Sequence, residues 1–392
     1  MTIELGLLAL GGITLLAWVG LGIDGALGQR WVLFLRRCSA PAGEARARLP
    51  PLSVVFGARN EAEGVEPAVR SMLALDYPDF EVVAVNDRSD DATGDILARL
   101  AAADDRLRVV DVTELPSGWL GKNHALWTGA HAATGDLILF TDADVIFEPS
   151  VAARAVAAIV ERDIDHVAGA TDVTAHGFGL QLFIATFALF FNGYFRPWRA
   201  GDPRSDAYVG FGGFNLVRRT AYERAGTHAA LAMDPLDDVN LGKALKKSGA
   251  HQVCAVPGPM ARVEWYPTLT AAIRGLEKNT MAGVNWSFGL LFGGMAAQIL
   301  FTAWPFLAIL MLEGPARWLN VAVVIVVVTV HGAMLSETSL PTWLPLFLPI
   351  GVLLVAWTYM RAAALTYWRG GIEWRGTFYS LAELRRGELP PA

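Results

Sequence analysis

Long apolar runs without charged side chains constrain the fold of this chain more than any other feature. The first of them, Leu5–Ile23, is about as long as a helix that spans the hydrocarbon core of a bilayer. A cleaved signal peptide is the alternative. However, Glu4 makes the start of the run acidic rather than basic, and the run is long for the apolar part of such a peptide. We therefore expect residues 1–27 to form a transmembrane anchor.

Three further runs of this kind lie near the C-terminus: Phe288–Leu312, Trp318–Leu335 and Pro341–Met360. Helices that are apolar on all sides and of spanning length are typical of membrane segments. The composition agrees, because 53% of the residues are hydrophobic and only 18% are charged, where a soluble domain has about a quarter. These runs predict a membrane region of two or three helices over residues 287–360.

Arginines follow the first and the last apolar run. They are Arg30, Arg36, Arg37, Arg46 and Arg48 after the first, and Arg361, Arg369, Arg375, Arg385 and Arg386 after the last. Positive flanks face the cytoplasm, so we expect a multi-pass protein of the cell (inner) membrane whose middle domain and tail, residues 361–392, are cytosolic. Three C-terminal crossings would put the tail outside. One run should therefore not cross, and Phe288–Leu312, interrupted by Gly293, Gly294 and Pro305, is the candidate.

Residues 50–286 show the pattern of an α/β domain. Short runs rich in Val and Ile alternate with amphipathic helical patterns, as in a mostly parallel sheet with helices on both faces. The predicted strands are Ser53–Phe56, Glu81–Val85 and Leu137–Phe140, and the predicted helices are Pro67–Leu75, Asp91–Ala103 and Asn123–Ala133. Phe178–Phe195 is apolar and aromatic, and it could be either a core helix or a shallow membrane-contacting element.

Acidic residues follow three of the predicted strands. Asp142 and Asp144 come directly after a buried strand, where two carboxylates repel each other unless a cation lies between them. Hard oxygen ligands select Mg²⁺ or Mn²⁺, which complete their coordination with water and substrate phosphates. Asp91 and Ser89, by contrast, suit helix capping. The net charge of -6 argues against a nucleic acid partner.

Six segments in this order resemble family 2 glycosyltransferases of the GT-A fold. They are SVVFGARNE (Ser53–Glu61), EVVAVNDRSDDAT (Glu81–Thr93), GWLGKNHAL (Gly118–Leu126), LILFTDAD (Leu137–Asp144), GFGGFNLVRRTAYERAG (Gly210–Gly226) and DDVNLGKALKKSG (Asp237–Gly249). The GWLGK segment and the membrane runs resemble the branch that glycosylates lipids, which includes ceramide glucosyltransferase-like, hopanoid-associated and carotenoid-associated enzymes.

The resemblance implies roles on the donor side of the site. Glu61 and Asp87 would hold the nucleoside of a nucleotide-sugar donor, and Lys122 would lie near its diphosphate. Asp142 would face the sugar or ribose, and Asp144, with Asp142, would hold Mg²⁺ or Mn²⁺. For Lys122 the alternative is an ordinary solvated residue at the start of a helix.

Further roles follow on the acceptor side. Asp238 would be the general base, and Asp237 stands where the family's acidic pair has Glu. Gly212 and Gly213 match the acceptor-side glycines. Asp237 and Asp238 also suit the first turn of a helix, where negative charge is favourable, and both interpretations can hold together.

The implied reaction is an inverting transfer of one sugar from a donor, expected to be UDP-linked, to a hydroxyl of a membrane lipid. The processive relatives' Q-x-x-R-W motif is missing, since Arg274–Asn279 reads RGLEKN. This disfavours a polysaccharide synthase. A polyprenyl-phosphate glycosyltransferase remains the nearest alternative. A silent membrane scaffold that binds nucleotide sugars is disfavoured because the acidic residues are all present.

Overall fold

The structure is a computed structural model that describes residues 2–374 and 376–386, so Arg375 and the end of the predicted tail lie outside it. The chain forms two compact units. The α/β unit comprises Trp31–Val173 and Pro197–Glu264, with the segment after Leu381. The helical unit comprises the chain up to Arg30, Thr174–Arg196 and Trp265–Leu381.

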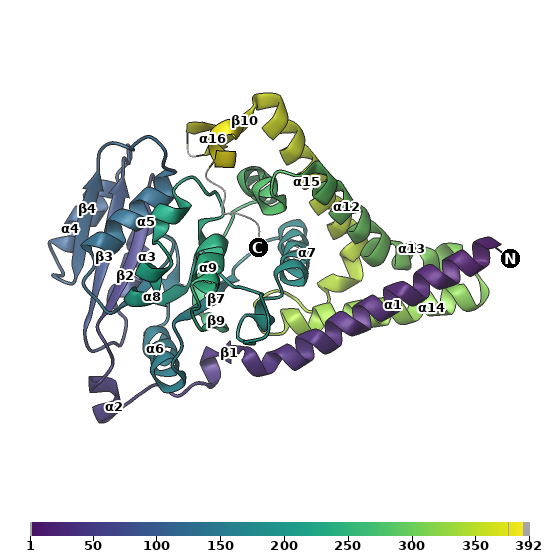
Figure 1. Cartoon of the computed structure of the whole chain (residues 1–392), viewed down its shortest axis with the longest axis horizontal. Helices are drawn as coiled ribbons and strands as arrows, with labels where there is room; N and C mark the ends of the chain where they lie inside the picture. Colours follow the sequence, from purple (N-terminus) through teal and green to yellow (C-terminus); the bar gives the residue numbers. More distant parts are fainter. Residues whose placement is uncertain (1, 375, 387–392) are drawn as a thin grey trace. The chain divides into compact units, whose positions relative to one another are not determined.

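The α/β unit contains one mixed sheet (Figure 1). Its strands are β1 (Leu33–Phe34), β2 (Leu52–Ala58), β3 (Phe80–Asp87), β4 (Leu107–Val112), β5 (Leu137–Phe140), β6 (Ile146–Phe147), β7 (His166–Val173), β8 (Asn215–Arg218) and β9 (Gln252–Val263). The order is β1-β9-β7-β8-β5-β2-β3-β4, and β6 pairs with β9. The neighbours β5, β2, β3 and β4 are parallel, whereas β8 runs antiparallel to both β5 and β7.

The helices of this unit are α2 (Gly43–Ala47), α3 (Val65–Leu73), α4 (Thr93–Ala101), α5 (Gly121–Ala132), α6 (Val151–Arg162), α8 (Arg219–Arg224) and α9 (Asp237–Lys247). Three of them, α3, α4 and α5, correspond to the helical patterns predicted between the strands. Helix α5 lies close to the sheet, because a Cβ at Gly129 would be 2.5 Å from Val55 Cγ1. This close approach fixes the start of α5 over the carboxyl ends of β2 and β3.

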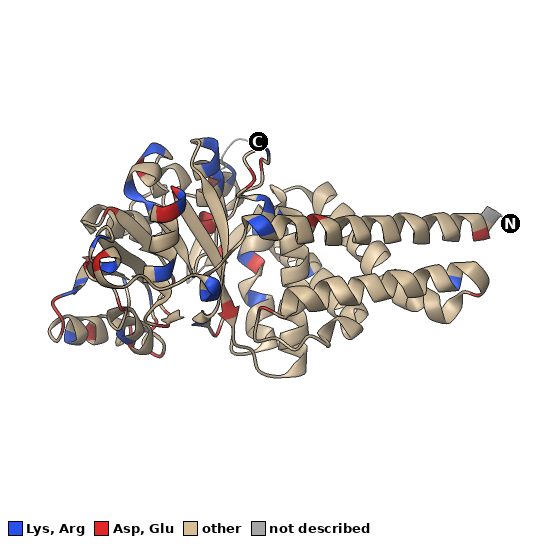
Figure 2. Cartoon of the chain, turned by 90° about the horizontal axis from the view of Figure 1, so that it is seen from below, with Lys and Arg blue, Asp and Glu red and all other residues tan. Residues whose placement is uncertain are grey.

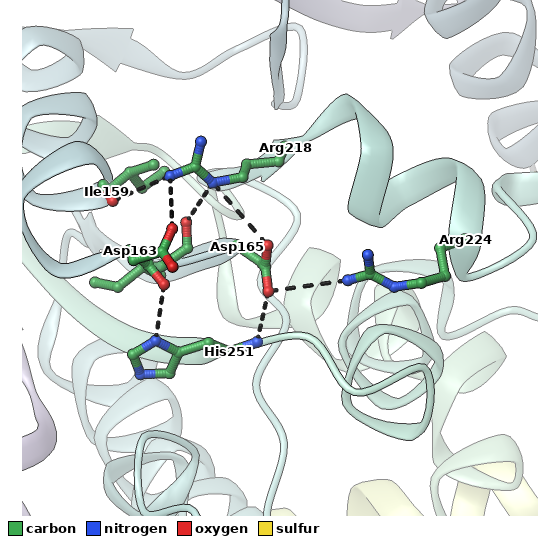
Figure 3. A network of polar contacts seen from close by, with 7 residues as sticks. Ile159, Asp163, Asp165, Arg218, Arg224 and His251 are labelled. Carbon is green, nitrogen blue, oxygen red and sulfur yellow. Dashed lines mark hydrogen bonds and ion pairs between the residues drawn. The ribbon is translucent and has the colours of Figure 1, made fainter.

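A polar network holds the turn between α6 and β7 against the neighbouring strands (Figure 3). The Arg218 guanidinium donates to the Ile159 carbonyl at 3.3 Å, and the Asp165 carboxylate accepts the His251 backbone N–H at 2.9 Å. Asp163, at φ 49°, is in the left-handed conformation that ends α6. Because its side chain is almost fully exposed, the carbonyl contacts matter more here than its ion pair with Arg218.

The helical unit contains the apolar runs. Its helices are α1 (Thr2–Gly28), α7 (Phe178–Phe195), α10 (Leu269–Gly275), α11 (Glu277–Thr280), α12 (Phe288–Gln298), a π-turn (Ile299–Ala303), α13 (Trp304–Met311), α14 (Gly314–Leu335) and α15 (Leu348–Arg369), with a hairpin of β10 (Gly371–Trp374) and β11 (Thr377–Ser380) at its end. The short α16 (Leu381–Arg386) follows the hairpin and belongs to the α/β unit after Leu381. Among the described residues, five helical segments are long and apolar enough to cross a membrane. Figure 2 shows α1 and α14 almost without charged residues between their ends.

The predicted domain of residues 50–286 differs from the α/β unit at several points. The unit already begins at Trp31, since β1 pairs with β9. Residues 174–196 and 265–286 belong instead to the helical unit. Helix α7 is apolar around most of its surface, and it packs on α15 through Thr186 and Gly351. Helix α7 therefore packs within the helical unit, where seven of its residues are buried.

The interruptions expected in Phe288–Leu312 do not break its helix. Gly293 and Gly294 lie inside α12, and Pro305, which has no N–H to donate, comes at the start of α13 just after the π-turn. The irregularity falls instead on the π-turn Ile299–Ala303, which keeps the chain helical from Phe288 to Met311. In addition, α15 extends to Arg369, so the predicted tail begins as helix.

Candidate active site

The strand order brings the predicted acidic residues to one edge of the sheet. Strands β5, β2 and β3 are parallel neighbours, so their carboxyl ends lie side by side. Asp87 ends β3, Glu61 follows β2, and Asp142 and Asp144 follow β5. In open α/β sheets this edge is where ligands bind.

Lys122 connects the strand ends to the start of α9. Its ammonium lies 2.9 Å from Asp142 Oδ1 and 3.5 Å from Asp237 Oδ2. Burial opposes its charge, but the carboxylates of Asp142, Asp237 and Asp238 outweigh burial and raise the pKa of Lys122 above its usual value. A permanently charged lysine in a cluster of carboxylates is therefore built into this edge, rather than an ordinary solvated residue at a helix start.

Gly212 lies at the centre of this cluster. A Cβ there would be 2.9 Å from Asp142 Oδ2, 3.3 Å from Lys122 Nζ and 3.4 Å from Asp238 Oδ2. Any side chain at this position would therefore fill the space between the charged groups. Gly213 has a different neighbour, because its Cβ would be 2.5 Å from Thr171 Cγ2 on β7. Of the two predicted glycines, only Gly212 borders the cluster.

Asp144 lies among negative charges. Burial, together with the carboxylates of Asp142 and Glu61, raises the pKa of Asp144 to about 7. Such repulsion is relieved by a cation, and oxygen ligands of this kind fit Mg²⁺ or Mn²⁺. Within residues 2–374 and 376–386, no cluster of three or more His, Cys, Asp or Glu side chains forms a complete metal site. Asp142 and Asp144 thus fit an ion that takes its remaining ligands from water and phosphate.

Asp238 lies in the first turn of α9, and its Oδ1 accepts the Val239 backbone N–H at 2.8 Å. Burial and the neighbouring carboxylate of Asp237 raise the pKa of Asp238 above its usual value. The raised pKa makes this carboxylate a stronger base than an exposed one. The two interpretations of the acidic pair are compatible, because the same side chains occupy a helix N-terminus and border the Lys122 cluster.

The carboxylate of Asp87 is buried and paired with a neighbouring side chain. Its two oxygens accept from Arg88, at 2.7 Å to Nε and 2.9 Å to Nη2, and the residue is 4% exposed. Helix α5 begins against this pair, since a Cβ at Gly121 would be 2.8 Å from both side chains. Each carboxylate oxygen can still accept a second hydrogen bond. Sequence reasoning did not foresee Arg88 as the partner of Asp87.

The capping role expected for Asp91 agrees with its contact at the start of α4, whereas Ser89 bonds to another loop instead. Asp91 Oδ1 accepts the Thr93 backbone N–H at the start of α4, and its Oδ2 accepts the Ala62 N–H at 3.1 Å. The Ser89 hydroxyl accepts the Asn60 N–H. These bonds shape the loop that carries Glu61.

The support of α9 is a second feature that sequence reasoning missed. The buried Asn123 amide donates to the backbone carbonyls of Leu231 and, at 2.9 Å, Asp234. The Asp234 carboxylate in turn accepts the Leu236 N–H, just before α9, and the Asn240 amide at 2.7 Å. Asn123 directly follows Lys122, so one helix start positions both the lysine and the loop that leads to Asp237 and Asp238.

We expect Asn123→Ala to lower the free energy of unfolding by about 1–3 kcal/mol for each carbonyl left without a partner. Thermal unfolding of the purified protein measures this change. Thr128→Ala, at a half-buried position of the same helix, is the control and should change stability far less. An unchanged melting temperature in Asn123→Ala would show that these hydrogen bonds do not support α9.

Comparison with known proteins agrees with this geometry. The profile of the family described as Glycosyl transferase family 2 matches residues 53–226. Two curated relatives are the Probable glycosyltransferase YdaM of Bacillus subtilis, 36% identical over 103 residues, and the Beta-monoglucosyldiacylglycerol synthase of Trichormus variabilis, 35% identical over 103 residues. Each alignment covers 26% of this chain, and 24% and 22% of the respective relative, so it spans about a quarter of either protein.

A solved structure extends the similarity of fold beyond the profile. The mannosyltransferase PcManGT from Pyrobaculum calidifontis, in complex with GDP-Man and Mn²⁺, has a TM-score of 0.55 and 18% identity; the match covers 92% of this chain and 98% of that one. The predicted GT-A fold, with a mostly parallel sheet, is thereby confirmed; β6 and β8 pair antiparallel with their neighbours. Residues 53–226 of this chain therefore resemble a domain of glycosyltransferase family 2.

Proposed function

We propose that this protein is an inverting glycosyltransferase that moves a single sugar from a nucleotide donor, UDP-linked in our expectation, to a hydroxyl of a membrane lipid. The observation that carries the proposal is the cluster of Lys122, Asp142 and Asp237, bordered by Asp238 and by Gly212. The cluster would supply a cation to bind a diphosphate, a carboxylate to bind a sugar, and a carboxylate to accept a proton.

On the donor side, the Lys122 ammonium would neutralise the diphosphate, and Glu61 and Asp87 would hold the nucleoside. Asp142 and Asp144 would hold Mg²⁺ or Mn²⁺, which when bound stabilises negative charge on the leaving diphosphate. The raised pKa of Asp144 supports this assignment, because its carboxyl lies in a place where a cation is favourable. The relatives themselves do not fix which nucleoside this chain binds.

On the acceptor side, the Asp238 carboxylate would take the proton of the acceptor hydroxyl as that oxygen attacks the anomeric carbon. The bond between this carbon and the diphosphate oxygen breaks, and the nucleoside diphosphate leaves with the electron pair. One displacement of this kind inverts the anomeric configuration. The space at Gly212, between Asp142 and Asp238, is where sugar and acceptor would meet.

The lipid acceptor is proposed from the helical unit. Five helical segments in the described part of the chain are apolar enough to cross a membrane, so the chain's substrate would be reached in or at a bilayer. One relative is named for a glycolipid, a monoglucosyldiacylglycerol. The membrane itself is proposed to be the cell (inner) membrane, with the α/β unit in the cytoplasm, where nucleotide sugars are available.

We expect purified protein, given a panel of UDP- and GDP-sugars and a total lipid extract, to form a lipid heavier by one sugar residue. Mass spectrometry of the lipid phase detects the product, and Asp238→Asn serves as the inactive control. A ladder of products would indicate polymer synthesis. A product that loses its sugar in mild acid would be a glycosyl phosphate and would favour a polyprenyl-phosphate acceptor instead. No product with any donor would contradict the proposal.

A further inference from the structure

The number of crossings follows from the directions of the helices. Helix α7 lies between Val173 and Pro197, and both of these residues belong to the α/β unit. The strands on either side, β7 and β8, are hydrogen-bonded neighbours in one sheet. A helix whose two ends return to the same sheet cannot cross a bilayer, although its composition would allow it.

Helices α1 and α14 run in the same direction. A Cβ at Gly11 would be 2.9 Å from Leu319, and a Cβ at Gly22 would be 2.9 Å from Val330, so the residue numbers rise together along the contact. Figure 1 shows the two helices side by side. Since α1 leads directly into Trp31 of the α/β unit, the end of α14 lies on the side of the membrane that holds this unit.

The segment α12–α13 runs in the opposite direction. It begins at Phe288, only a short helical connection after the last strand of the α/β unit, and it ends at Met311, just before α14 starts. About midway, the carbonyl of Phe301 accepts the indole N–H of Trp18 at 2.9 Å, so the segment passes the middle of α1. It therefore crosses away from the α/β unit, and α14 returns.

Both ends of α15 lie on the side of the membrane on which α1 ends. Near its start, the carbonyl of Thr342 would be 3.3 Å from a Cβ at Gly332, in the last turn of α14. Near its end, Arg361 forms an ion pair with Glu277, and the Tyr367 hydroxyl donates to the Trp286 carbonyl at 3.1 Å. Glu277 and Trp286 precede the outward crossing of α12. Within the helical unit, Figure 1 shows α15 running across the direction of α1.

We infer that α15 does not cross the membrane but lies in the lipid interface of the leaflet that faces the α/β unit. The crossings are then three: α1, α12–α13 and α14. This assignment differs from the sequence expectation, which gave the non-crossing role to Phe288–Leu312. It keeps the expected sides of both termini, because three crossings put the N-terminus opposite to the tail.

One face of α15 fits a lipid surface. Apart from Arg369 at its end, the exposed residues of α15 recur every three or four positions along the helix: Ile350, Leu353, Trp357, Met360, Ala364 and Trp368. All are apolar, two are tryptophans, and Trp368 at the end of the helix is 84% exposed. Tryptophan is enriched at the boundary between lipid and water, and an apolar face of this kind buries into the headgroup region.

Exposed aromatic residues gather near the start of α15. Phe178 at the start of α7 stacks on Trp343, and Phe347 packs against both rings. Trp343 and Phe347 lie between the end of α14 and the start of α15, and all three rings are at least 40% exposed. An exposed aromatic cluster beside the end of a spanning helix fits the boundary between lipid and water better than a second protein.

Cysteine accessibility tests the path of the chain. Cys38 and Cys254 are first replaced by alanine, and one cysteine is then introduced at a time. Asp105→Cys marks the α/β unit and Glu373→Cys marks the hairpin. Glu313→Cys and Ser336→Cys mark the loops before and after α14. An impermeant maleimide applied to spheroplasts and to lysed cells reports their sides. We expect Ser336→Cys and Glu373→Cys to behave like Asp105→Cys, and Glu313→Cys to behave oppositely.

Each rival arrangement gives another pattern. If α15 crosses and α12–α13 does not, Glu313→Cys follows Asp105→Cys and Ser336→Cys reverses. If all three C-terminal segments cross, Glu373→Cys reverses as well as Glu313→Cys. Either pattern would overturn the inference, and neither depends on whether the protein transfers sugar.

Spin labels on the exposed face test what covers α15. We expect nitroxides at Leu353, Trp357 and Met360 in reconstituted protein to be accessible to oxygen dissolved in the lipid. Their oxygen accessibility should lack the maximum that the centre of a spanning helix shows. A maximum near Trp357 would overturn the interfacial placement. Dipolar broadening between labels of two copies, without contact with lipid oxygen, would replace the bilayer by a second copy of this chain and contradict the proposal equally.

Discussion

Replacing Asp238 by asparagine is expected to lower the rate of sugar transfer by about 10²–10⁴-fold, the usual scale of general acid–base catalysis. Asparagine keeps the size of the side chain and can still accept the Val239 N–H, so the first turn of α9 should persist. The variant should therefore fold and bind its donor. It lacks only the negative oxygen that would take the acceptor's proton.

Two measurements separate catalysis from helix stability. Thermal shift with nucleotide reports folding and donor binding, whereas transfer to lipid reports the chemistry. Asp95→Asn is a matched control, because Asp95 is an exposed acidic residue in the first turn of α4. A helix-charge effect alone costs about 0.3–1 kcal/mol of stability in either variant. A near-normal transfer rate in Asp238→Asn would remove Asp238 from the mechanism and would favour an anionic acceptor that has no proton to give up.

The same carboxylate predicts how the wild-type rate depends on pH. Burial and Asp237 raise the pKa of Asp238, so the rate should fall with decreasing pH earlier than it would for an exposed aspartate. The sign follows because only the ionised form can accept a proton. This acid limb should be missing from the residual activity of Asp238→Asn.

Local patterns were sufficient where a strand carries its own signal. The runs that became β2, β3 and β5 are apolar on both faces, and their buried positions required a parallel interior strand. Once these strands are neighbours, the acidic residues after them must meet at one edge. The grouping of Glu61, Asp142 and Asp144 could therefore be predicted from the sequence, and the raised pKa of Asp144 agrees with it.

Contacts between distant segments had no such signal. Nothing in the spacing of Asn123 and Asp234 indicates that the amide of one holds the carbonyl of the other. The position of α15 was hidden for a related reason. Its apolar residues satisfy the length and composition of a spanning helix, and only its contacts with Glu277 and Trp286 show that it turns back. Hydropathy measures whether a segment can cross, not where its ends lie.

Replacing Asp144 by asparagine is expected to abolish metal-dependent transfer, with a loss of roughly 10³-fold or more. A bound divalent ion contributes several kcal/mol of charge stabilisation, and each ~1.4 kcal/mol is tenfold in rate. Excess EDTA should inactivate the wild-type protein, and Mg²⁺ or Mn²⁺ should restore it. Asp136→Asn, at the opposite and exposed end of β5, is the control and should keep both activity and metal response.

Stability gives a readout of the same prediction that does not require turnover. The folded-state pKa of Asp144 is raised from 3.8 to about 7, so near pH 7 and above its ionised form opposes folding unless a cation is bound. In EDTA this carboxyl's contribution to wild-type stability should improve as the pH falls through about 7, and Asp144→Asn should melt no lower than wild type. With nucleotide and Mn²⁺ the order should reverse, because only the wild type gains the ion. Equal stabilisation of wild type and Asp144→Asn by Mn²⁺ would mean that the metal is bound elsewhere. Transfer that continued in excess EDTA would mean that no metal is used. Either result would leave Asp144 with a structural role.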